Sequence, residues 1–412
     1  MSFKDLKLNK PILRAVAEAG YDNPTLVQEK TIPLVLERQD VITSAQTGTG
    51  KTAAFALPIL QLLYDQQDAP KKGKTIKALV ISPTRELAIQ IAKNFKTYAS
   101  HTNLTSAVIY GGTSIEPQID ILKKGIDILV ATPGRLLDLH KQDELNLDYV
   151  EVFVLDEADL MLDMGFIDDV RKIERLCPED KQTLLFSATM PYKVEQLASS
   201  ILKTPKRIEV TPTSSAAKDV SQVLYYVPKR NKIELCLHLL RNTVKGSILI
   251  FRRTKFGVDK LHQTLISNGY DDAERLHGDR SQIERQNALA DFKRGKVNIL
   301  IATDVAARGI DIIELDSVIN FDLPNVPETY VHRIGRTGRA GNFGHSYSLC
   351  SADEKSYVQT IQKLINVQIP VENDHPYPLD PKAKPIVHKK KGSKYKKGRK
   401  SEASKKKKKR WY

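Results

Sequence analysis

Short runs of apolar, largely β-branched residues recur along the chain, and they predict buried strands. The runs are continuous rather than alternating in polarity, which is typical of strands covered on both faces in a parallel sheet. In the first half they occupy residues 40–45, 77–82, 106–110, 127–132, 150–156 and 183–189, and in the second half residues 247–251, 297–303 and 316–322. Because helical stretches separate them, the sequence predicts two tandem, doubly wound α/β domains.

A change of composition marks the expected domain boundaries. Residues 211–219, TPTSSAAKD, are polar and aperiodic, so they predict a flexible linker between a first domain at 1–210 and a second at 220–369. After Ile369 come five prolines and a Lys-rich run. This composition cannot bury a core, so residues 370–412 are expected to be a disordered tail.

The formal net charge of +15 comes from that tail. Residues 382–412 hold sixteen basic residues and one acidic residue, whereas residues 1–381 carry 48 of each. This distribution excludes a uniformly basic, histone-like protein and indicates a neutral body with a cationic extension.

Other features of the composition favour a cytoplasmic protein. No apolar run approaches the roughly 20 residues of a membrane span, and the N-terminus lacks the apolar core of a signal peptide. Cys177, Cys236 and Cys350 are far apart in apolar surroundings, so we expect buried thiols in a reducing compartment. We expect a monomer that has no contact with a membrane.

AQTGTGKT at residues 45–52 fits the phosphate-binding loop pattern, with Ala45 in place of the usual first glycine. It follows a predicted strand and precedes a helical stretch, where backbone N–H groups can turn toward phosphate oxygens. Lys51 would reach the β- and γ-phosphates, and the Thr52 hydroxyl would ligate Mg²⁺. The predicted nucleotide contacts in this loop are Gln46, Thr47, Gly48, Thr49, Gly50, Lys51 and Thr52.

A second acidic strand end completes the predicted hydrolytic site. VEVFVLDEAD places Asp156 and Glu157 directly after a buried strand. Asp156 is suited to binding Mg²⁺ directly or through its waters, and Glu157 to polarising the attacking water. Together with Lys51 they form the predicted catalytic set of the first domain.

These motifs, with SAT at 187–189 and HRIGRTGR at 332–339, resemble the DEAD-box RNA helicases in order and spacing over about residues 1–370. The resemblance implies two RecA-like domains and an RNA-stimulated ATPase that uses ATP and Mg²⁺. It also implies local unwinding of short RNA duplexes or remodelling of RNA–protein complexes. The short N-terminus and basic tail resemble the bacterial RhlE-like group within the family.

The resemblance also carries over residues outside the phosphate loop. GYDNPTLVQ at 20–28 is similar to the adenine-reading Q motif, with Leu26 where the family more often has proline. It implies adenine contacts from Gln28, whose carboxamide offers both a donor and an acceptor, and from an upstream aromatic. The nucleotide-side residues implied are Phe3, Tyr21, Thr25, Gln28 and, in the second domain, Asp311.

HRIGRTGR presents arginines three residues apart, which are suited to stabilising charge that develops on a γ-phosphate. By resemblance, Arg336 and Arg339 are arginine fingers, while His332 and Arg333 mediate contacts between the domains. The segments SAT and ATDVAARGID are similar to those that couple hydrolysis to strand separation. The coupling residues implied are Ser187, Ala188, Thr189, Asp304, Arg308, His332 and Arg333.

Several further segments follow strand ends and carry groups that can bind phosphates, through arginine side chains, hydroxyls or helix-start N–H groups. These contacts are to the RNA backbone, which implies little sequence specificity and discrimination from DNA through the 2′-hydroxyls. The predicted RNA-binding residues are Pro83, Thr84, Arg85, Gly111, Gly112, Thr132, Arg135, Thr254, Arg285 and Thr303.

Two alternative functions stay open at this point. The first is a DNA-directed helicase of the same superfamily 2, which shares the phosphate loop and the arginines. The second is an RNA-annealing chaperone or assembly platform, in which the cationic tail supplies most of the binding.

Overall fold

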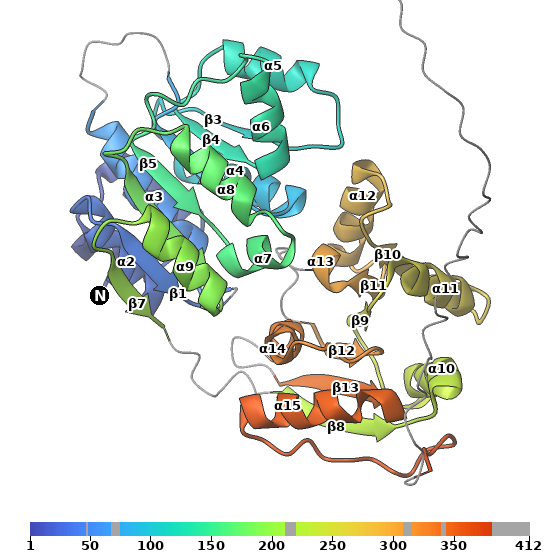
Figure 1. The fold of residues 1–412 in the computed structure, drawn as a ribbon. Coiled ribbons are helices and arrows are strands. Elements are labelled where there is room, and N and C mark those ends of the chain that lie inside the picture. Colours follow the sequence, from blue (N-terminus) through green and yellow to red (C-terminus); the bar gives the residue numbers. More distant parts are fainter. Residues whose placement is uncertain (47, 67–74, 211–219, 308–314, 339–342, 381–412) are drawn as a thin grey trace, which may run out of the picture.

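The computed structural model describes residues 1–46, 48–66, 75–210, 220–307, 315–338 and 343–380. They form two α/β domains, each with a parallel sheet between layers of helices (Figure 1). This confirms the doubly wound fold predicted for both halves. The expected linker and residues 381–412 of the expected tail lie outside the described residues.

The first domain contains a seven-stranded sheet in the order β3-β4-β2-β5-β6-β1-β7. Its strands are β1 (Val41–Ser44), β2 (Ala78–Ile81), β3 (Ser106–Ile109), β4 (Ile128–Ala131), β5 (Val152–Leu155), β6 (Gln182–Ser187) and β7 (Lys206–Glu209). Its helices are η1 (Phe3–Leu6), α1 (Lys10–Glu18), α2 (Leu26–Leu36), α3 (Lys51–Tyr64), α4 (Arg85–Tyr98), α5 (Glu116–Lys123), α6 (Pro133–Lys141), α7 (Ala158–Asp163), α8 (Ile167–Arg175) and α9 (Tyr192–Ile201).

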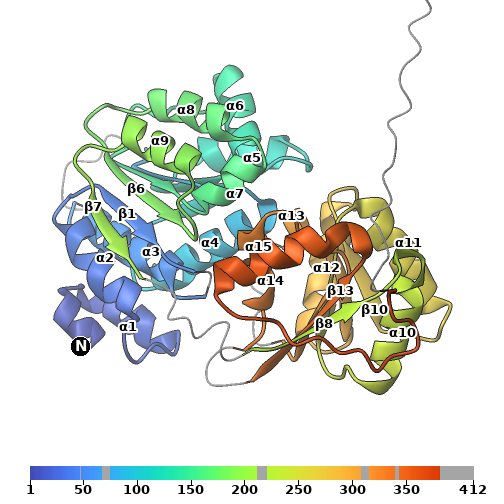
Figure 2. The same cartoon turned by 60° about the horizontal axis from the view of Figure 1, so that its bottom comes forward.

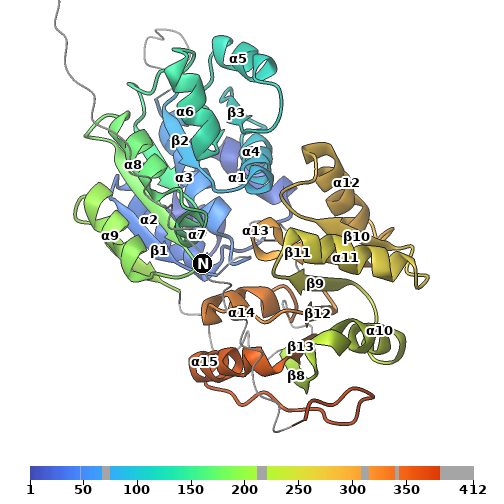
Figure 3. The same cartoon turned by 45° about the vertical axis from the view of Figure 1, so that its right-hand side comes forward.

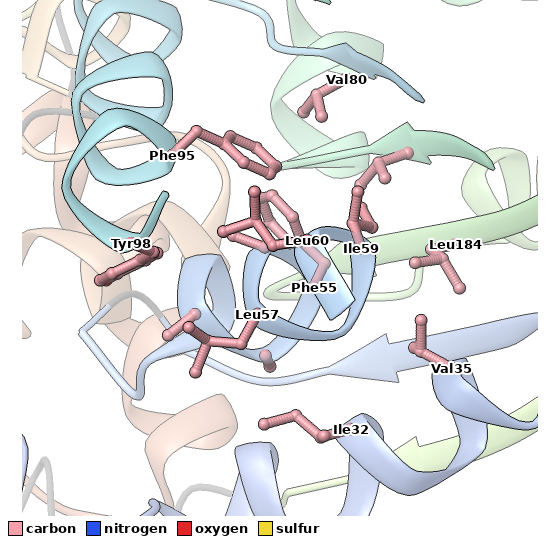
Figure 4. Packing of buried hydrophobic residues seen from close by; sticks show 14 of the residues in the cluster. Ile32, Val35, Phe55, Leu57, Ile59, Leu60, Val80, Phe95, Tyr98 and Leu184 are labelled. Atoms are coloured by element: carbon pink, nitrogen blue, oxygen red, sulfur yellow. The ribbon is translucent and has the colours of Figure 1, made fainter. Parts of the chain in front are cut away.

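Two apolar layers hold this sheet. Side chains of α1 to α4 pack on one face, and side chains of α6 to α9 pack on the other. Helix α3, which follows the phosphate loop, is buried on almost all sides (Figure 4). The Phe55 ring lies 5.1 Å from that of Phe186 and 6.2 Å from that of Phe95, measured between centroids. The phosphate loop is therefore anchored to a helix that the core fixes in place.

The second domain contains a six-stranded sheet in the order β10-β11-β9-β12-β13-β8. Its strands are β8 (Val220–Tyr226), β9 (Ile248–Arg252), β10 (Ala273–Leu276), β11 (Ile299–Thr303), β12 (Ser317–Asn320) and β13 (Gly344–Cys350). Its helices are η2 (Lys229–Asn231), α10 (Lys232–Asn242), α11 (Lys255–Ile266), α12 (Gln282–Lys293), α13 (Asp304–Ala307), α14 (Pro327–Ile334), η3 (Ala352–Glu354) and α15 (Lys355–Ile365). Figure 2 shows α14 and α15 side by side over this sheet.

Four strands were not predicted from the apolar pattern, namely β7, β8, β10 and β13. Their sequences are polar or alternate in polarity, so they lack the continuous apolar run that marks the other strands. In β13, Ser346 and Ser348 are fully buried, and each hydroxyl lies 3.3 Å from the Asn320 side-chain amide of β12. Of the four strands only β13 is internal to its sheet, and its buried serines are tolerated there because the neighbouring strand β12 satisfies their hydroxyls.

Ordered packing continues beyond Ile369, where the sequence pattern predicts that it ends. Glu372 N–H donates to the Leu224 carbonyl at 3.0 Å, and Leu379 N–H donates to the Tyr226 carbonyl at 3.0 Å. The rings of His375 and Tyr225 meet edge to face at 5.6 Å. Residues 370–380 therefore lie along β8, the edge strand of the sheet, which differs from the disorder expected for them.

Candidate nucleotide and RNA site

The order of the first sheet brings three predicted motifs to one edge. Strands β5, β6 and β1 are neighbours, and Ser44 of β1 pairs with Ser187 of β6. The phosphate loop, the Asp156–Glu157 pair and the SAT segment follow the carboxyl ends of these strands. In open α/β sheets ligands bind at such an edge.

A cavity of about 400 Å³ opens at this edge, and both domains line it. Arg336 is contributed by the second domain, and the other lining residues come from the first. Of the predicted residues, the cavity brings together Tyr21, Thr25, Gln28, Gly48, Gly50, Lys51, Thr52, Asp156, Glu157 and Arg336. Gln46 and Thr49 are not among the lining residues, although the Thr49 hydroxyl closes the loop by donating to the Gln46 carbonyl at 2.7 Å.

A buried ion pair forms the floor of the cavity. Lys51 Nζ lies 2.8 Å from Glu157 Oε1, and both side chains are more than nine-tenths buried. Glu157 has a left-handed backbone, with φ of 53°, an uncommon conformation that costs about 1–3 kcal/mol and concentrates at functional sites. This turn places its carboxylate against the phosphate loop.

The buried charges shift one another's protonation. Burial raises the pKa of Asp156 to about 7, and the neighbouring Glu157 charge adds to the effect, while Lys51 opposes it. Burial alone would lower the pKa of Lys51, but the Glu157 and Asp156 carboxylates outweigh it and hold the pKa above its ordinary value. Strongly shifted groups in a cavity are typical of catalytic sites.

Gln28 connects the predicted adenine pocket to the phosphate loop. Its Oε1 accepts from Thr25 N–H at 3.0 Å, and its Nε2 donates to the Gly50 carbonyl at 3.2 Å. Gly50 has φ of +90°, and a Cβ there would lie 2.4 Å from Gln28 Nε2, so only glycine fits. A carboxamide retains one further donor and one further lone pair, which leaves Gln28 free to read a base edge.

Phe3 does not lie in the cavity. Its ring is 5% exposed and packs in the core with Leu6 and Ile12, so in this structure it is unavailable to a base. The aromatic residues that line the cavity are Tyr21 and Tyr98 of α4, whose hydroxyls lie 3.2 Å apart. The residues of α4 that line the cavity were not predicted from the sequence, although its polar lining residues Gln90, Asn94 and Tyr98 recur at a four-residue helical spacing. The lining residues that were not predicted are Asn23, Ala53, Leu87, Gln90, Asn94 and Tyr98.

A second groove, of about 380 Å³, runs between the two domains. The predicted RNA-binding residues among its lining are Pro83, Thr84, Arg85, Gly111, Thr132, Arg135 and Arg285. A Cβ on Gly112 would lie 2.3 Å from the Arg85 guanidinium, so the two predicted residues are adjacent. Thr254 and Thr303 are not among the lining residues.

The domains also meet at a buried ion pair beside this groove. Arg285 lies 2.8 Å from the Glu86 carboxylate, and Gln282 Nε2 donates to the same carboxylate at 2.9 Å. Glu86 is 7% exposed at its side chain. Glu86 was not predicted; its place beside Arg85 on the turn into α4 was the one available signal.

Comparisons with known proteins agree with this geometry. Residues 25–197 match the family described as DEAD/DEAH box helicase, and residues 231–341 match the helicase conserved C-terminal domain. The chain is 44% identical over 368 residues to the DEAD-box ATP-dependent RNA helicase RhpA of Helicobacter pylori, covering 89% of this chain and 73% of that protein. The chain belongs to the DEAD-box family of ATP-dependent RNA helicases.

Solved structures of DEAD-box proteins match across both domains. S. cerevisiae Dbp5 bound to RNA and ADP BeF₃ is 32% identical, with a TM-score of 0.79 over 90% of this chain and 95% of that chain. Mss116p bound to ssRNA and AMP-PNP is 30% identical, with a TM-score of 0.83 over 91% of this chain and 80% of that chain. The two domains are therefore RecA-like helicase domains, as predicted, whereas placement in the RhlE-like group stays a prediction.

In this DEAD-box protein Asp159 connects the motifs, a role that sequence reasoning did not assign. Its Oδ2 accepts from the Thr189 backbone N–H at 2.9 Å and from the Thr189 hydroxyl at 2.8 Å. Burial would raise the pKa of Asp159, but His332 of the second domain, Lys51 and Thr189 lower it below its ordinary value. SAT and DEAD thus meet at the Asp159 carboxylate, and His332 of HRIGRTGR acts on it electrostatically.

Arg333 and Arg336 of HRIGRTGR occupy different surroundings. Arg336 lines the nucleotide cavity, whereas the described hydrogen bonds of Arg333 all stay within the second domain. Arg333 holds Asp304 at 2.6 and 2.7 Å and is 2% exposed, so its place is inside that domain rather than between the domains as expected. Ala188 has no described side-chain role, and the predicted site residues Thr47, Arg308, Asp311 and Arg339 lie outside the described residues.

The donor set at the cavity fits Mg²⁺. The Thr52 hydroxyl and the Asp156 carboxylate both line it, and oxygen ligands of this kind are the ones that Mg²⁺ prefers. Over the described residues, no cluster of three or more His, Cys, Asp or Glu side chains could hold a metal by itself. Among the same residues no helix is long and apolar enough to cross a membrane.

Proposed function

We propose that this chain couples hydrolysis of Mg²⁺-bound ATP to closure of its two domains on single-stranded RNA. The observation that carries the proposal is the shared cavity: Lys51, Asp156 and Glu157 come from one domain and Arg336 from the other. A site divided in this way is complete only when the domains are together. ATP and RNA therefore favour the same closed arrangement, and by linkage each strengthens binding of the other.

The roles of the residues follow from their positions. Gly48, Gly50 and Lys51 hold the phosphates, and Gln28 with Tyr21 and Thr25 faces the base. Thr52 and Asp156 would hold Mg²⁺, which neutralises phosphate charge when bound. Glu157 orients and deprotonates the attacking water once phosphate oxygens replace it as the partner of Lys51. Arg336 stabilises the charge that develops on the γ-phosphate.

RNA binding is assigned to the groove between the domains. Arg85 and Arg135 bind phosphates, and Thr84 and Thr132 are the N-cap residues of helices α4 and α6, whose first free N–H groups donate to phosphate oxygens. These contacts reach the backbone rather than base edges, which supports low sequence specificity. Closure of the domains bends the bound strand and releases its partner strand over a short duplex. The domains reopen after the cleaved phosphate leaves.

Glu157→Gln tests the assignment, with Glu144→Gln, a half-buried residue paired with exposed Lys123, as the matched control. The Glu157 variant should bind ATP and RNA but lose nearly all turnover, because the amide cannot accept the proton from water. Glu144→Gln should turn over like the wild type. Wild-type turnover by Glu157→Gln would refute the role of Glu157.

Substrate class is tested with RNA and DNA strands of equal length and sequence. We expect RNA to stimulate the ATPase and DNA to do so weakly, and stronger stimulation by DNA would favour the DNA-directed alternative. Cytoplasmic location and a monomeric state are also part of the proposal. The three described cysteines support the first because all are free and buried, and light scattering of the purified chain tests the second.

A further inference from the structure

Exposed apolar side chains gather at one edge of the second sheet. Phe256, Ile283 and Val305 are 75%, 71% and 49% exposed. They follow β9, β10 and β11, which are neighbours in the order β10-β11-β9. Adjacent strands lie about 4.8 Å apart, so the segments that follow the carboxyl ends of these three strands lie along one short edge of the sheet. Figure 3 shows α11, α12 and α13, which carry these residues, together at this end of the domain.

Each of these side chains stands two residues from a predicted RNA contact. Phe256 follows Thr254, Val305 follows Thr303, and Ile283 precedes Arg285. The start of α11 and the loop before α12 are also joined, because Lys255 forms an ion pair with Asp279 at 2.5 Å. Val305 and Arg285 line the groove assigned to RNA. The apolar edge is thus continuous with the phosphate-binding groups.

The turn that carries Phe256 is held in one conformation. The Thr254 hydroxyl accepts from Gly257 N–H at 3.0 Å and caps α11. A Cβ on Gly257 would lie 2.6 Å from the Arg252 guanidinium, so the backbone packs closely there. The core-facing side of α11 is formed by Val258, Leu261 and Leu265. Phe256 contributes nothing to that core, and its ring is presented to solvent.

On the basis of the proposed function, we propose that Phe256 stacks on a base of the bound RNA strand, with Ile283 and Val305 extending the apolar surface. Isolated exposed apolar residues are ordinary, but three beside one row of phosphate-binding groups indicate a shared ligand. RNA offers both features that this edge would recognise, a charged backbone and flat apolar base faces. Stacking is tolerant of sequence because every base has such a face, so it adds affinity without base readout.

Abasic RNA tests the proposal because it removes a base and keeps the backbone. A single abasic site is moved along a ten-nucleotide RNA, and binding to the full chain is measured by fluorescence anisotropy with a non-hydrolysable ATP analogue. One abasic position should weaken wild-type binding about 5- to 150-fold. Phe256→Ala should lose a similar factor on intact RNA and lose nothing further at that abasic position. Phe256→Trp should bind as well as the wild type.

Tyr149→Ala is the matched control, since Tyr149 is 57% exposed and precedes β5 at the opposite end of the first sheet. It should bind intact and abasic RNA like the wild type. Thermal melting of Phe256→Ala checks the fold, and normal binding by Phe256→Trp shows that an aromatic ring is what matters. Additive losses, or no effect of Phe256→Ala, would overturn stacking and leave the surface to a protein partner. Failure of RNA to stimulate the wild-type ATPase would instead refute the proposed function.

Discussion

Replacing Glu86 with alanine should weaken domain closure while leaving each domain folded. Its carboxylate has two partners in the second domain, an ion pair with Arg285 at 2.8 Å and a hydrogen bond donated by Gln282 Nε2 at 2.9 Å. Hydrogen bonds to charged groups contribute about 1.5–3 kcal/mol each. An unpaired Arg285 held in place would cost about 3–5 kcal/mol, but opening of the domains returns it to water. We therefore expect a loss of about 1–3 kcal/mol, or a 5- to 150-fold smaller closing constant.

Single-molecule energy transfer measures this constant directly. Dyes attached through Ser100→Cys and Asn268→Cys report on the two domains, since both positions are exposed and the native thiols are buried. Closure is titrated with RNA and an ATP analogue. Glu174→Ala is the control because Glu174 pairs with buried Lys181 at 2.8 Å within the first domain. It should lower stability without changing closure.

A double-mutant cycle separates domain closure from RNA contact. Arg285 is also a predicted phosphate ligand, so Arg285→Ala should cost more than Glu86→Ala. If the pair holds the domains, the double variant should close about as poorly as Arg285→Ala alone. If the Glu86→Ala variant closed at the same RNA concentrations as the wild type, the role of the Glu86–Arg285 pair in closure would be refuted.

Three further outcomes follow from the structure. Arg333→Leu should lower the unfolding free energy of the second domain by about 2–4 kcal/mol in urea, because Asp304 loses a bidentate partner; unchanged stability would contradict its buried role. Burial raises the pKa of Cys177, Cys236 and Cys350 to about 12, so a thiol reagent at pH 7.5 should label none of them before denaturation. Deleting residues 382–412 should weaken RNA binding and flatten its salt dependence while RNA-stimulated ATPase survives; loss of all activity on RNA would favour the platform function.

Local sequence was sufficient for nine of the thirteen strands in the described residues and for the motif loops that follow them. A phosphate loop is a contiguous stretch whose glycines and lysine act together, so AQTGTGKT and DEAD predicted the floor of the cavity without reference to the rest of the chain. Continuous apolar runs likewise predicted nine strands, because burial on both faces removes polar positions. Strands such as β13 escaped because their burial depends on a partner, Asn320, that is remote in sequence.

The tertiary structure decided which of the candidate residues share a site. Phe3 and Arg333 occupy motif positions, yet one packs in the first core and the other holds Asp304 inside the second domain. Glu86, Tyr98 and Asp159 gain their places from contacts with residues far along the chain. The order of the strands and the contact between the domains set the distances between these residues, and a local sequence pattern predicts neither of them. The sequence by itself therefore determined the family chemistry, whereas the pairing of the domains determined which groups can act together.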